Sequence, residues 1–256
     1  MGFRVAAIQL ALGKASYSKT ISDAKFAVTD AARKGARIAC LPEHWLLEYR
    51  DKVGEAIEEL SRIAKETEIF IVTGANYVKL DCGETRIRSQ LIDSEGKIVG
   101  IQDKIHLFLA EKTSATAGDS FQLFKTAFAN IGITICYDNV FPESSRTLAL
   151  KNADLLFVPS RITAQGMEPW LLYLRTRALE NRLPIIAPNI TYPPKYVGGS
   201  VIIDLAESST NIIVPKIVVS AQEEEKVILA DVGIEKAGKL RRERLGERKP
   251  NVYGLS

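Results

Sequence analysis

Apolar runs rich in β-branched residues alternate along the chain with segments whose apolar positions recur every three or four residues. The first pattern is typical of strands buried on both faces, and the second of helices that cover such strands. Strands are predicted at 3–10, 36–43, 68–78, 154–160 and 184–190, and helices at 20–34, 51–67, 143–151 and 168–182. This alternation predicts a layered α/β protein.

Hairpin signals interrupt the alternation in the middle of the chain. The segments 85–93 and 97–104 flank a Ser-Glu-Gly turn, and 121–128 is followed closely by a second apolar segment, 130–138. Three further strands are predicted between 198 and 232. Because hairpins pair strands antiparallel and crossovers pair them in parallel, the sheet must be mixed, and the strands suffice for two sheets. No low-complexity linker divides the chain, so we predict a single domain.

The charges are nearly balanced, with 34 basic and 31 acidic residues and a net charge of +3. That excess is too small to indicate a nucleic-acid surface. Basic residues gather at 239–249, but glutamates interleave with them. Mixed charges weaken any field of a single sign, so a surface tail or a subunit contact is favoured there over an anion site.

The cysteines and histidines narrow the chemistry. Cys40, Cys82 and Cys136 form no CxxC pair, and their odd number argues against a disulfide framework, so a reducing cytoplasm is expected. The apolar start of the chain is too short for a secretory signal or a membrane span. His44 and His106 belong to no close Cys/His cluster, so no metal site is expected.

Three polar residues lie at the ends of predicted strands, where α/β folds commonly place reactive groups. For Glu43, the sequence supports two interpretations equally: a solvated carboxylate and a partly desolvated general base. Lys104 occupies a place where most lysines are surface charges, but a buried lysine would stabilise a developing oxyanion. Cys136 lies at a strand-to-turn junction, where a thiol can face a pocket and the Tyr137 N–H can point at a substrate oxygen. Cys40 lies inside its strand and is expected to be core packing.

The flanking sequences strengthen these assignments. The chain contains RVAAIQL (4–10), CLPEHW (40–45), QDKIHLF (102–108), GITICYDNVFPE (132–143) and GGSVIID (198–204). Several ordered motifs at sensible spacing arise by chance far less often than one short pattern. With these motifs the chain resembles the nitrilase superfamily, also called the carbon–nitrogen hydrolases, over essentially its whole length.

That resemblance implies a four-layer α-β-β-α sandwich with two mixed β-sheets, in agreement with the strand pattern. It implies a catalytic set of Glu43, Lys104 and Cys136, with Glu111 as a second glutamate that orients Lys104 and the substrate. The implied reaction passes through a thioester on Cys136 and uses no metal or organic cofactor. Members commonly form homodimers or larger homo-oligomers, so within the domain 1–256 the C-terminal tail 235–256 is expected at a subunit interface.

The substrate is less closely defined by the sequence. Cys-Tyr-Asp at 136–138 looks like the amidase-like branch, so the leading hypothesis is an amidase that releases ammonia from a small amide. Asn139 and Val140, however, stand where many amidase-like members carry an arginine. A nitrilase or an N-carbamoyl amine hydrolase is the enzymatic alternative. Arg161, after Val-Pro-Ser, could attract a substrate carboxylate, although a solvated arginine is the simpler interpretation.

Two alternatives of another class remain open at this point. The chain could be a catalytically silent binding protein on the same fold, or a cysteine redox protein, although no resolving cysteine lies near Cys136. In a papain-like enzyme His44 or His106 would be the base. The family pattern assigns that role to the glutamate, so both histidines are expected to be structural or to line the pocket. We expect a small-molecule partner and neither nucleic acid nor membrane.

Overall fold

The first strand explains how the protein is layered. In β1 (Phe3–Ala11), Val5 and Ala7 face one apolar core while Ala6 and Ile8 face another, because successive side chains of a strand point to opposite sides. Both faces are therefore buried, which accounts for the continuous apolar run. The structure is a computed structural model that describes residues 3–12, 16–208, 210, 212–222, 224 and 226–253.

One sheet has nine strands in the order β12-β11-β1-β2-β3-β5-β4, with β15 also beside β1 and β6 beside β5. Besides β1, its strands are β2 (Ile38–Cys40), β3 (Phe70–Val72), β4 (Asn76–Lys79), β5 (Thr85–Ile92), β6 (Ile98–Asp103), β11 (Ile190–Tyr192), β12 (Tyr196–Val197) and β15 (Lys226–Val232). It contains both parallel pairs, such as β1–β2–β3, and antiparallel pairs, such as β5–β6. The sheet is mixed, as predicted.

The other sheet has six strands in the order β14-β13-β10-β9-β8-β7. They are β7 (Leu123–Lys125), β8 (Asn130–Ile133), β9 (Leu155–Phe157), β10 (Ile185–Ala187), β13 (Val201–Glu207) and β14 (Ile213–Ser220). Here β8, β9 and β10 are parallel, and the flanking pairs are antiparallel.

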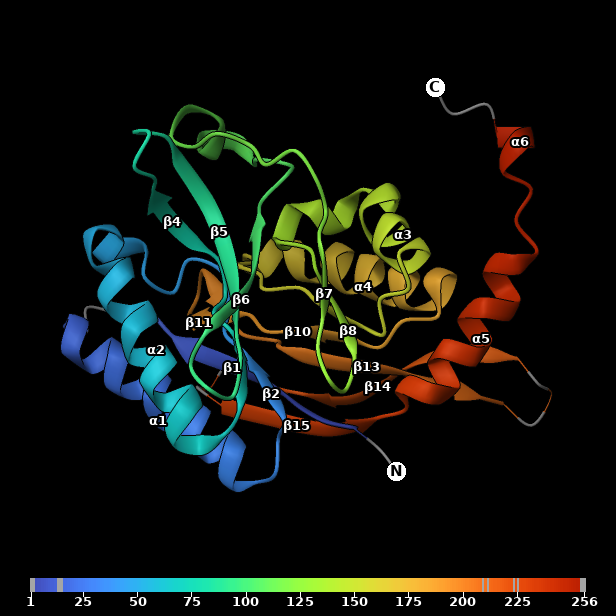
Figure 1. Ribbon diagram of the computed structural model, residues 1–256, viewed down its shortest axis with the longest axis horizontal. Helices are drawn as coiled ribbons and strands as arrows, with labels where there is room; N and C mark the ends of the chain where they lie inside the picture. Colours follow the sequence, from blue (N-terminus) through green and yellow to red (C-terminus); the bar gives the residue numbers. More distant parts are fainter. Residues whose placement is uncertain are drawn as a thin grey trace.

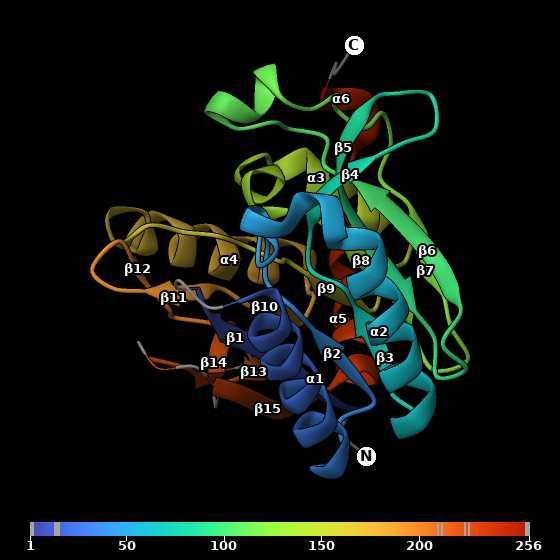
Figure 2. The ribbon, with the colours of Figure 1, turned by 90° about the vertical axis from the view of Figure 1, so that its left-hand side faces the viewer.

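Helices cover the outer faces of both sheets (Figures 1 and 2). The helices α1 (Tyr17–Arg33) and α2 (Val53–Thr67) pack on the nine-stranded sheet, and α3 (Pro142–Leu150) and α4 (Met167–Asn181) pack on the six-stranded one. A third apolar core lies between the sheets. The four-layer α-β-β-α sandwich with two mixed sheets is confirmed.

The predicted strand 68–78 is in fact two strands. Gly74 separates β3 from β4 with φ +74°, a backbone conformation that side-chain-bearing residues rarely adopt. A Cβ at Gly74 would lie 2.0 Å from the carbonyl oxygen of Pro42, so the glycine also allows the two segments to approach closely. The sequence pattern showed the apolar run but not this turn.

The basic C-terminal segment is not simply a tail. It forms α5 (Ile234–Gly246) and α6 (Pro250–Tyr253), and residues 254–256 lie outside the described residues. Arg241 of α5 is buried and pairs with Asp154 at 3.0 Å. Much of the segment predicted as a tail is therefore a helix docked on its own chain, whereas Figure 1 shows α6 standing apart from the sandwich.

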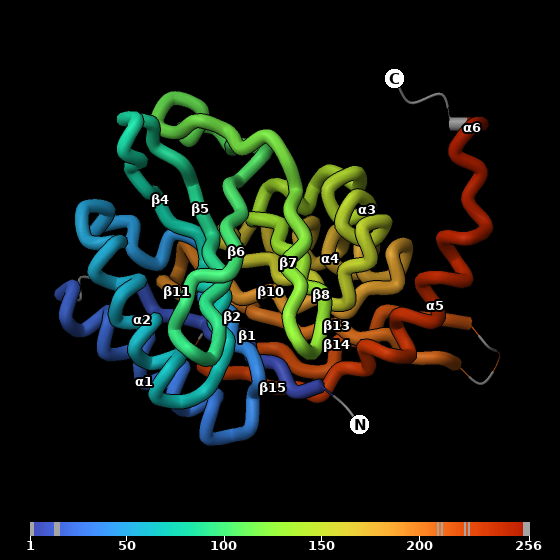
Figure 3. Tube along the Cα trace, viewed as in Figure 1, coloured from blue at the N-terminus to red at the C-terminus, as the bar shows by residue number. Residues whose placement is uncertain are grey.

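Short 3₁₀ turns occupy several connections, namely Leu47–Lys52, Leu109–Thr113, Cys136–Val140 and Ala164–Gly166. The second of them belongs to the connection between β6 and β7, the green segment at the top of Figure 3. Among the described helices, none is both long and apolar enough to cross a membrane.

Candidate active site

Two of the predicted site residues, Glu43 and Cys136, follow the carboxyl ends of parallel strands, one in each sheet. Glu43 comes three residues after β2, and Cys136 comes three residues after β8. The sheets meet here, because the Glu43 N–H donates to the carbonyl of Ser160, which follows β9, at 3.3 Å. The crevice beyond the carboxyl ends of parallel strands is where α/β proteins commonly bind ligands. The fold thus brings together segments that are far apart in the sequence.

Cys136 sits in a strained turn. Its φ is +46°, in the left-handed region that non-glycine residues seldom enter, and its N–H donates to the Pro159 carbonyl at 3.0 Å. The Glu43 carboxylate raises the pKa of the thiol, and the Arg161 backbone N–H lowers it, so both groups face the sulfur. His44 (φ +55°) and Leu109 (φ +45°), beside Glu43 and near Glu111, are in the same left-handed region. Backbone strain therefore occurs in the segments that carry Cys136, Glu43 and Glu111.

Lys104 is buried between two carboxylates. Its Nζ lies 2.7 Å from Glu43 Oε1 and 2.8 Å from Glu111 Oε2, and the side chain is only 1% exposed. A buried ammonium needs such partners because the loss of hydration disfavours its charge. Burial alone would lower the pKa of Lys104, but Glu43, Cys136 and Glu111 together hold it above its ordinary value. Lys104 is therefore a fixed positive charge.

The same network sets the protonation of Cys136 and Glu111. Burial raises the pKa of the Cys136 thiol, and the Glu43 carboxylate raises it further, against the opposing effect of Lys104. Burial would also raise the pKa of Glu111, but hydrogen bonds from His44 and Lys104 lower it to about 2. At neutral pH the site thus holds a thiol beside an ionised Glu111 and a protonated Lys104.

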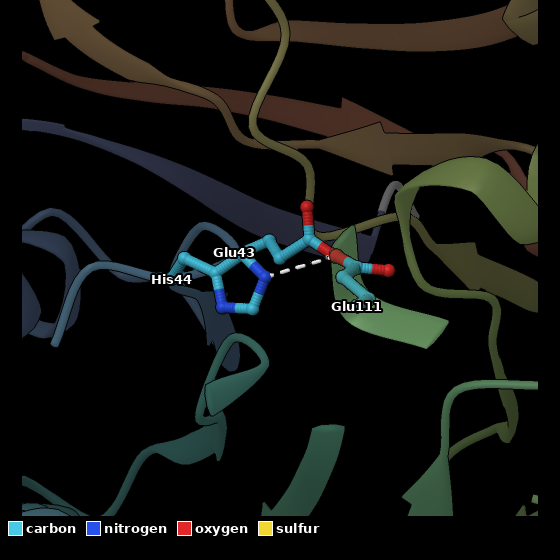
Figure 4. Close-up of side chains that lie close together, drawn as sticks. All are labelled: Glu43, His44 and Glu111. Atoms are coloured by element: carbon cyan, nitrogen blue, oxygen red, sulfur yellow. Dashed lines mark hydrogen bonds and ion pairs between the residues drawn. The ribbon is translucent and has the colours of Figure 1, made fainter. Parts of the chain in front are cut away.

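Figure 4 shows His44 reaching Glu111. The distance from His44 Nε2 to Glu111 Oε1 is 3.1 Å, and because a carboxylate only accepts, Nε2 carries the proton. The His44 ring also stacks on Tyr77, with 4.9 Å between centroids. Donor atoms of Glu43, His44 and Glu111 lie within 4.8 Å of one another, a spacing that could suit a metal ion. The Lys104 ammonium, however, already contacts both carboxylates and supplies the cationic partner there.

Asp138 ties the lysine segment to the cysteine turn. Its fully buried carboxylate accepts hydrogen bonds from the backbone N–H groups of Ile105, His106 and Ile135, and from His106 Nδ1. These residues directly follow Lys104 and directly precede Cys136. The placement of the two side chains therefore depends on one buried carboxylate.

The remaining two predicted residues have different surroundings. The Tyr137 ring packs against Phe108 at 4.9 Å and Phe141 at 5.3 Å, which leaves its backbone rather than its ring beside Cys136. Arg161 lines a cavity of about 260 Å³. The walls of this cavity include Trp45, Tyr49, Arg161, Tyr192, Lys195 and Tyr196.

A family model described as carbon–nitrogen hydrolase matches residues 4–242. The chain belongs to the carbon–nitrogen hydrolases. Omega-amidase NIT2 from Xenopus tropicalis is 29% identical to it over 93% of this chain and 91% of the relative. Omega-amidase NIT2-A from Xenopus laevis is 30% identical over 84% and 83%, respectively.

Solved structures share the fold. A carbon–nitrogen hydrolase from Helicobacter pylori G27 superposes with a TM-score of 0.85 at 21% identity, covering 98% of this chain and 96% of that one. An amidase from Nesterenkonia sp. gives 0.82 at 19% identity, covering 98% and 95%. These likenesses confirm the nitrilase-superfamily fold that the sequence motifs implied.

Three parts of this carbon–nitrogen hydrolase site were not predicted from its sequence. The His44–Glu111 contact joins residues 67 positions apart, and no pattern marks it. Asp138 lies in the same motif as Cys136, so a buried carboxylate there could have been suspected. Lys195 and Tyr196 belong to a Pro-Pro-Lys-Tyr segment without apolar periodicity, and only the fold brings them near Arg161.

Proposed function

We propose that this carbon–nitrogen hydrolase is an amidase that releases ammonia from a small primary amide through a thioester on Cys136. The observation that carries the proposal is the buried Glu43 carboxylate, which binds the Lys104 ammonium at 2.7 Å and acts on the Cys136 thiol. A thiol, a base and a fixed positive charge are what acyl transfer needs. The omega-amidase relatives support the choice of an amide.

The reaction begins with a neutral thiol, because the pKa of Cys136 is raised. Glu43 takes the thiol proton as sulfur attacks the amide carbon, so that proton transfer and attack are coupled. The Lys104 ammonium and the Tyr137 N–H stabilise the oxyanion. The carbon–nitrogen bond then breaks, Glu43 returns the proton to the departing nitrogen, and ammonia leaves an acyl thioester behind.

Hydrolysis of the thioester reverses these roles. Glu43 removes a proton from water, the resulting hydroxide attacks the acyl carbon, and the carboxylic acid leaves as the Cys136 thiol is restored. Glu111 takes no proton in this scheme. Its contacts with Lys104 and His44 orient the ammonium toward the oxyanion, which makes it a positioning residue.

An ammonia-release screen over primary amides, nitriles and N-carbamoyl compounds tests this assignment. The proposal predicts ammonia from one or more amides, without carbon dioxide. Turnover of nitriles alone would identify a nitrilase, and ammonia together with carbon dioxide would identify a carbamoyl hydrolase. No turnover in any class, with no labelling of Cys136 by iodoacetamide, would indicate a catalytically silent binding protein.

We also propose that the enzyme acts in the reducing cytoplasm as a homodimer or a larger homo-oligomer, with the end of the segment 235–256 at an interface. Free cysteines support the first part. The position of α6 apart from the sandwich and the 75% exposure of Val252 support the second. Light scattering of the full chain and of a chain that ends at Gly246 would test the proposed assembly. We expect a smaller assembly for the shortened chain. An unchanged mass of the assembly would refute the role of the end segment.

A further inference from the structure

The two carboxylates that bind Lys104 have different surroundings. Glu43 contacts the Lys104 ammonium through Oε1 at 2.7 Å and also faces the Cys136 sulfur. Glu111 contacts the same ammonium through both of its oxygens, at 2.9 and 2.8 Å. It accepts two further hydrogen bonds, from His44 Nε2 at 3.1 Å and from a backbone N–H at 2.7 Å. The donors around Glu111 therefore distinguish it from the carboxylate that serves as the base.

The His44 ring is held in one orientation, which Figure 4 shows. It stacks on Tyr77 with 4.9 Å between ring centroids and 13° between ring planes. The Arg50 guanidinium carbon in turn lies 3.8 Å from the centroid of the Tyr77 ring. The His44 backbone N–H donates to the carbonyl of Ala75 at 2.6 Å. A side chain fixed by packing and by backbone hydrogen bonds can present its donor without losing further freedom when substrate binds.

The second ring nitrogen of His44 identifies the tautomer. Nδ1 is buried and has no hydrogen-bond partner among the described residues. A proton on Nδ1 would be a buried donor without an acceptor, which destabilises that tautomer. Nε2 faces a carboxylate, which can only accept, so the proton belongs there. His44 thus gives Glu111 a hydrogen bond and takes no proton from it.

This hydrogen bond keeps Glu111 charged. Burial raises the pKa of Glu111, and the hydrogen bond from His44 is the largest of the opposing effects, ahead of the charge of Lys104. An ionised Glu111 holds the Lys104 ammonium in place, and a preorganised cation stabilises an oxyanion without moving during the reaction. Without the His44 donor, one buried oxygen of Glu111 would lose a partner and the ammonium would be held less firmly.

We propose that His44 is a positioning residue that holds Glu111 as the ionised anchor of Lys104 and so leaves proton transfer to Glu43 alone. This inference rests on the proposed amidase function, because it gives His44 a part in that reaction. His44 Nε2 lies 4.0 Å from Glu43 Oε1, beyond hydrogen-bond distance. His44 therefore acts through Glu111 and not on the base.

Two substitutions separate the donor from the ring. His44→Phe keeps a ring on Tyr77 and removes the donor. For an amide that wild type hydrolyses, kcat is expected to fall roughly 10- to 100-fold, the range for one hydrogen bond to a charged group. KM should hardly change, because Lys104 acts on the oxyanion of the transition state. His44→Gln restores a side-chain N–H donor and is expected to keep kcat close to the wild-type value. His44→Leu, which also lacks a donor, takes the place of the phenylalanine variant if the latter does not fold.

The reactivity of Cys136 shows whether the rest of the site stays intact. Methyl methanethiosulfonate is a small neutral reagent whose sulfur–sulfur bond breaks as it transfers a methylthio group to a thiolate and releases methanesulfinate. No oxyanion forms on a carbon atom, so the reaction does not use the cation that His44 is proposed to position. Mass spectrometry of the peptide that contains Cys136 gives the labelling rate, with the exposed Cys82 as internal reference. We expect equal rates in wild type and both variants.

The outcomes separate the role of His44 from the amidase assignment. Wild-type kcat in a folded variant without the donor would overturn the role of His44 and leave the amidase function standing. Equal losses in His44→Phe and His44→Gln, or labelling of Cys136 that falls together with kcat, would also overturn it, because the ring or the fold would then be responsible.

If wild type hydrolyses no amide, the amidase function fails, and NMR of the imidazole nitrogens at neutral pH still tests the inference. The chain has two histidines, so His106→Gln identifies the signals of His44. A proton on Nε2 alone supports the hydrogen bond to Glu111 on which the inference depends. A proton on Nδ1 refutes it.

Discussion

Replacing Glu111 by glutamine tests how strongly the buried charge network stabilises the fold. The Glu111 carboxylate binds Lys104 Nζ at 2.8 Å, His44 Nε2 at 3.1 Å and the Phe108 N–H at 2.7 Å, and its side chain is 12% exposed. Glutamine preserves the size of the side chain and removes its charge. Lys104 would then retain only Glu43 as an anionic partner.

The expected loss follows from the pKa of Glu111. Its ordinary value is 4.5, and the folded protein lowers it to about 2. This difference corresponds to about 3 kcal/mol of stability at neutral pH. Because the folded pKa is depressed, the stabilisation is complete above pH 4.5 and is lost as the pH falls through about 2. By pH 3 roughly half of it has gone.

Urea unfolding of wild type and Glu111→Gln between pH 7 and pH 3 measures this contribution. We expect the variant to be less stable by about 3 kcal/mol at pH 7 and the gap to narrow toward pH 3. Glu66→Gln, at an exposed position, serves as the control and should change stability by less than ~0.5 kcal/mol. A gap that is absent at pH 7, or that stays constant down to pH 3, would refute the reasoning.

Two further substitutions test the backbone around the site. Gly74→Ala should lower the free energy of unfolding by ~2 kcal/mol or more, because at a φ of +74° the added Cβ would clash with the Pro42 carbonyl oxygen. The control Gly54→Ala, in open space on α2, should be neutral or slightly stabilising. Equal unfolding free energies for the two variants would contradict this prediction. Asp138→Asn should destabilise the protein by about 2 kcal/mol, since an amide cannot accept hydrogen bonds from all the donors around Asp138. The control Asp119→Asn, at an exposed position, should hardly change the melting temperature in thermal unfolding. Similar melting temperatures for the two variants would refute the role of Asp138.

Much of the fold could be predicted because burial leaves a strong pattern in the sequence. The helix predicted at 20–34 corresponds to α1, whose buried residues recur every three or four positions, and Gly35, at φ +83°, follows its end. The four layers follow from strands buried on both faces. The break at Gly74 and the docking of α5 could not be predicted, because each depends on a distant residue, the Pro42 carbonyl in one case and Asp154 in the other.

The residues of the candidate site could be predicted from the sequence, but the contacts between them could not. Motifs placed Glu43, Lys104, Glu111 and Cys136 in the sequence, and the fold brings all four together. The strain at Cys136 could not be read from composition, because φ there is imposed by the hydrogen bond of its N–H to Pro159 and by the turn that follows. The cavity wall likewise depends on how the segment around Lys195 and Tyr196 lies beside the residues that follow β9, which no local pattern encodes.

Ammonia release by Cys136→Ala, measured beside wild type on an amide that wild type hydrolyses, tests the central claim most directly. Alanine removes the sulfur that would carry the acyl group and leaves Glu43 and Lys104 in place. The proposed mechanism predicts a fall in kcat of at least ~1,000-fold for a variant that keeps wild-type circular dichroism and melting behaviour. A folded Cys136→Ala protein that releases ammonia at the wild-type rate would contradict the thioester mechanism.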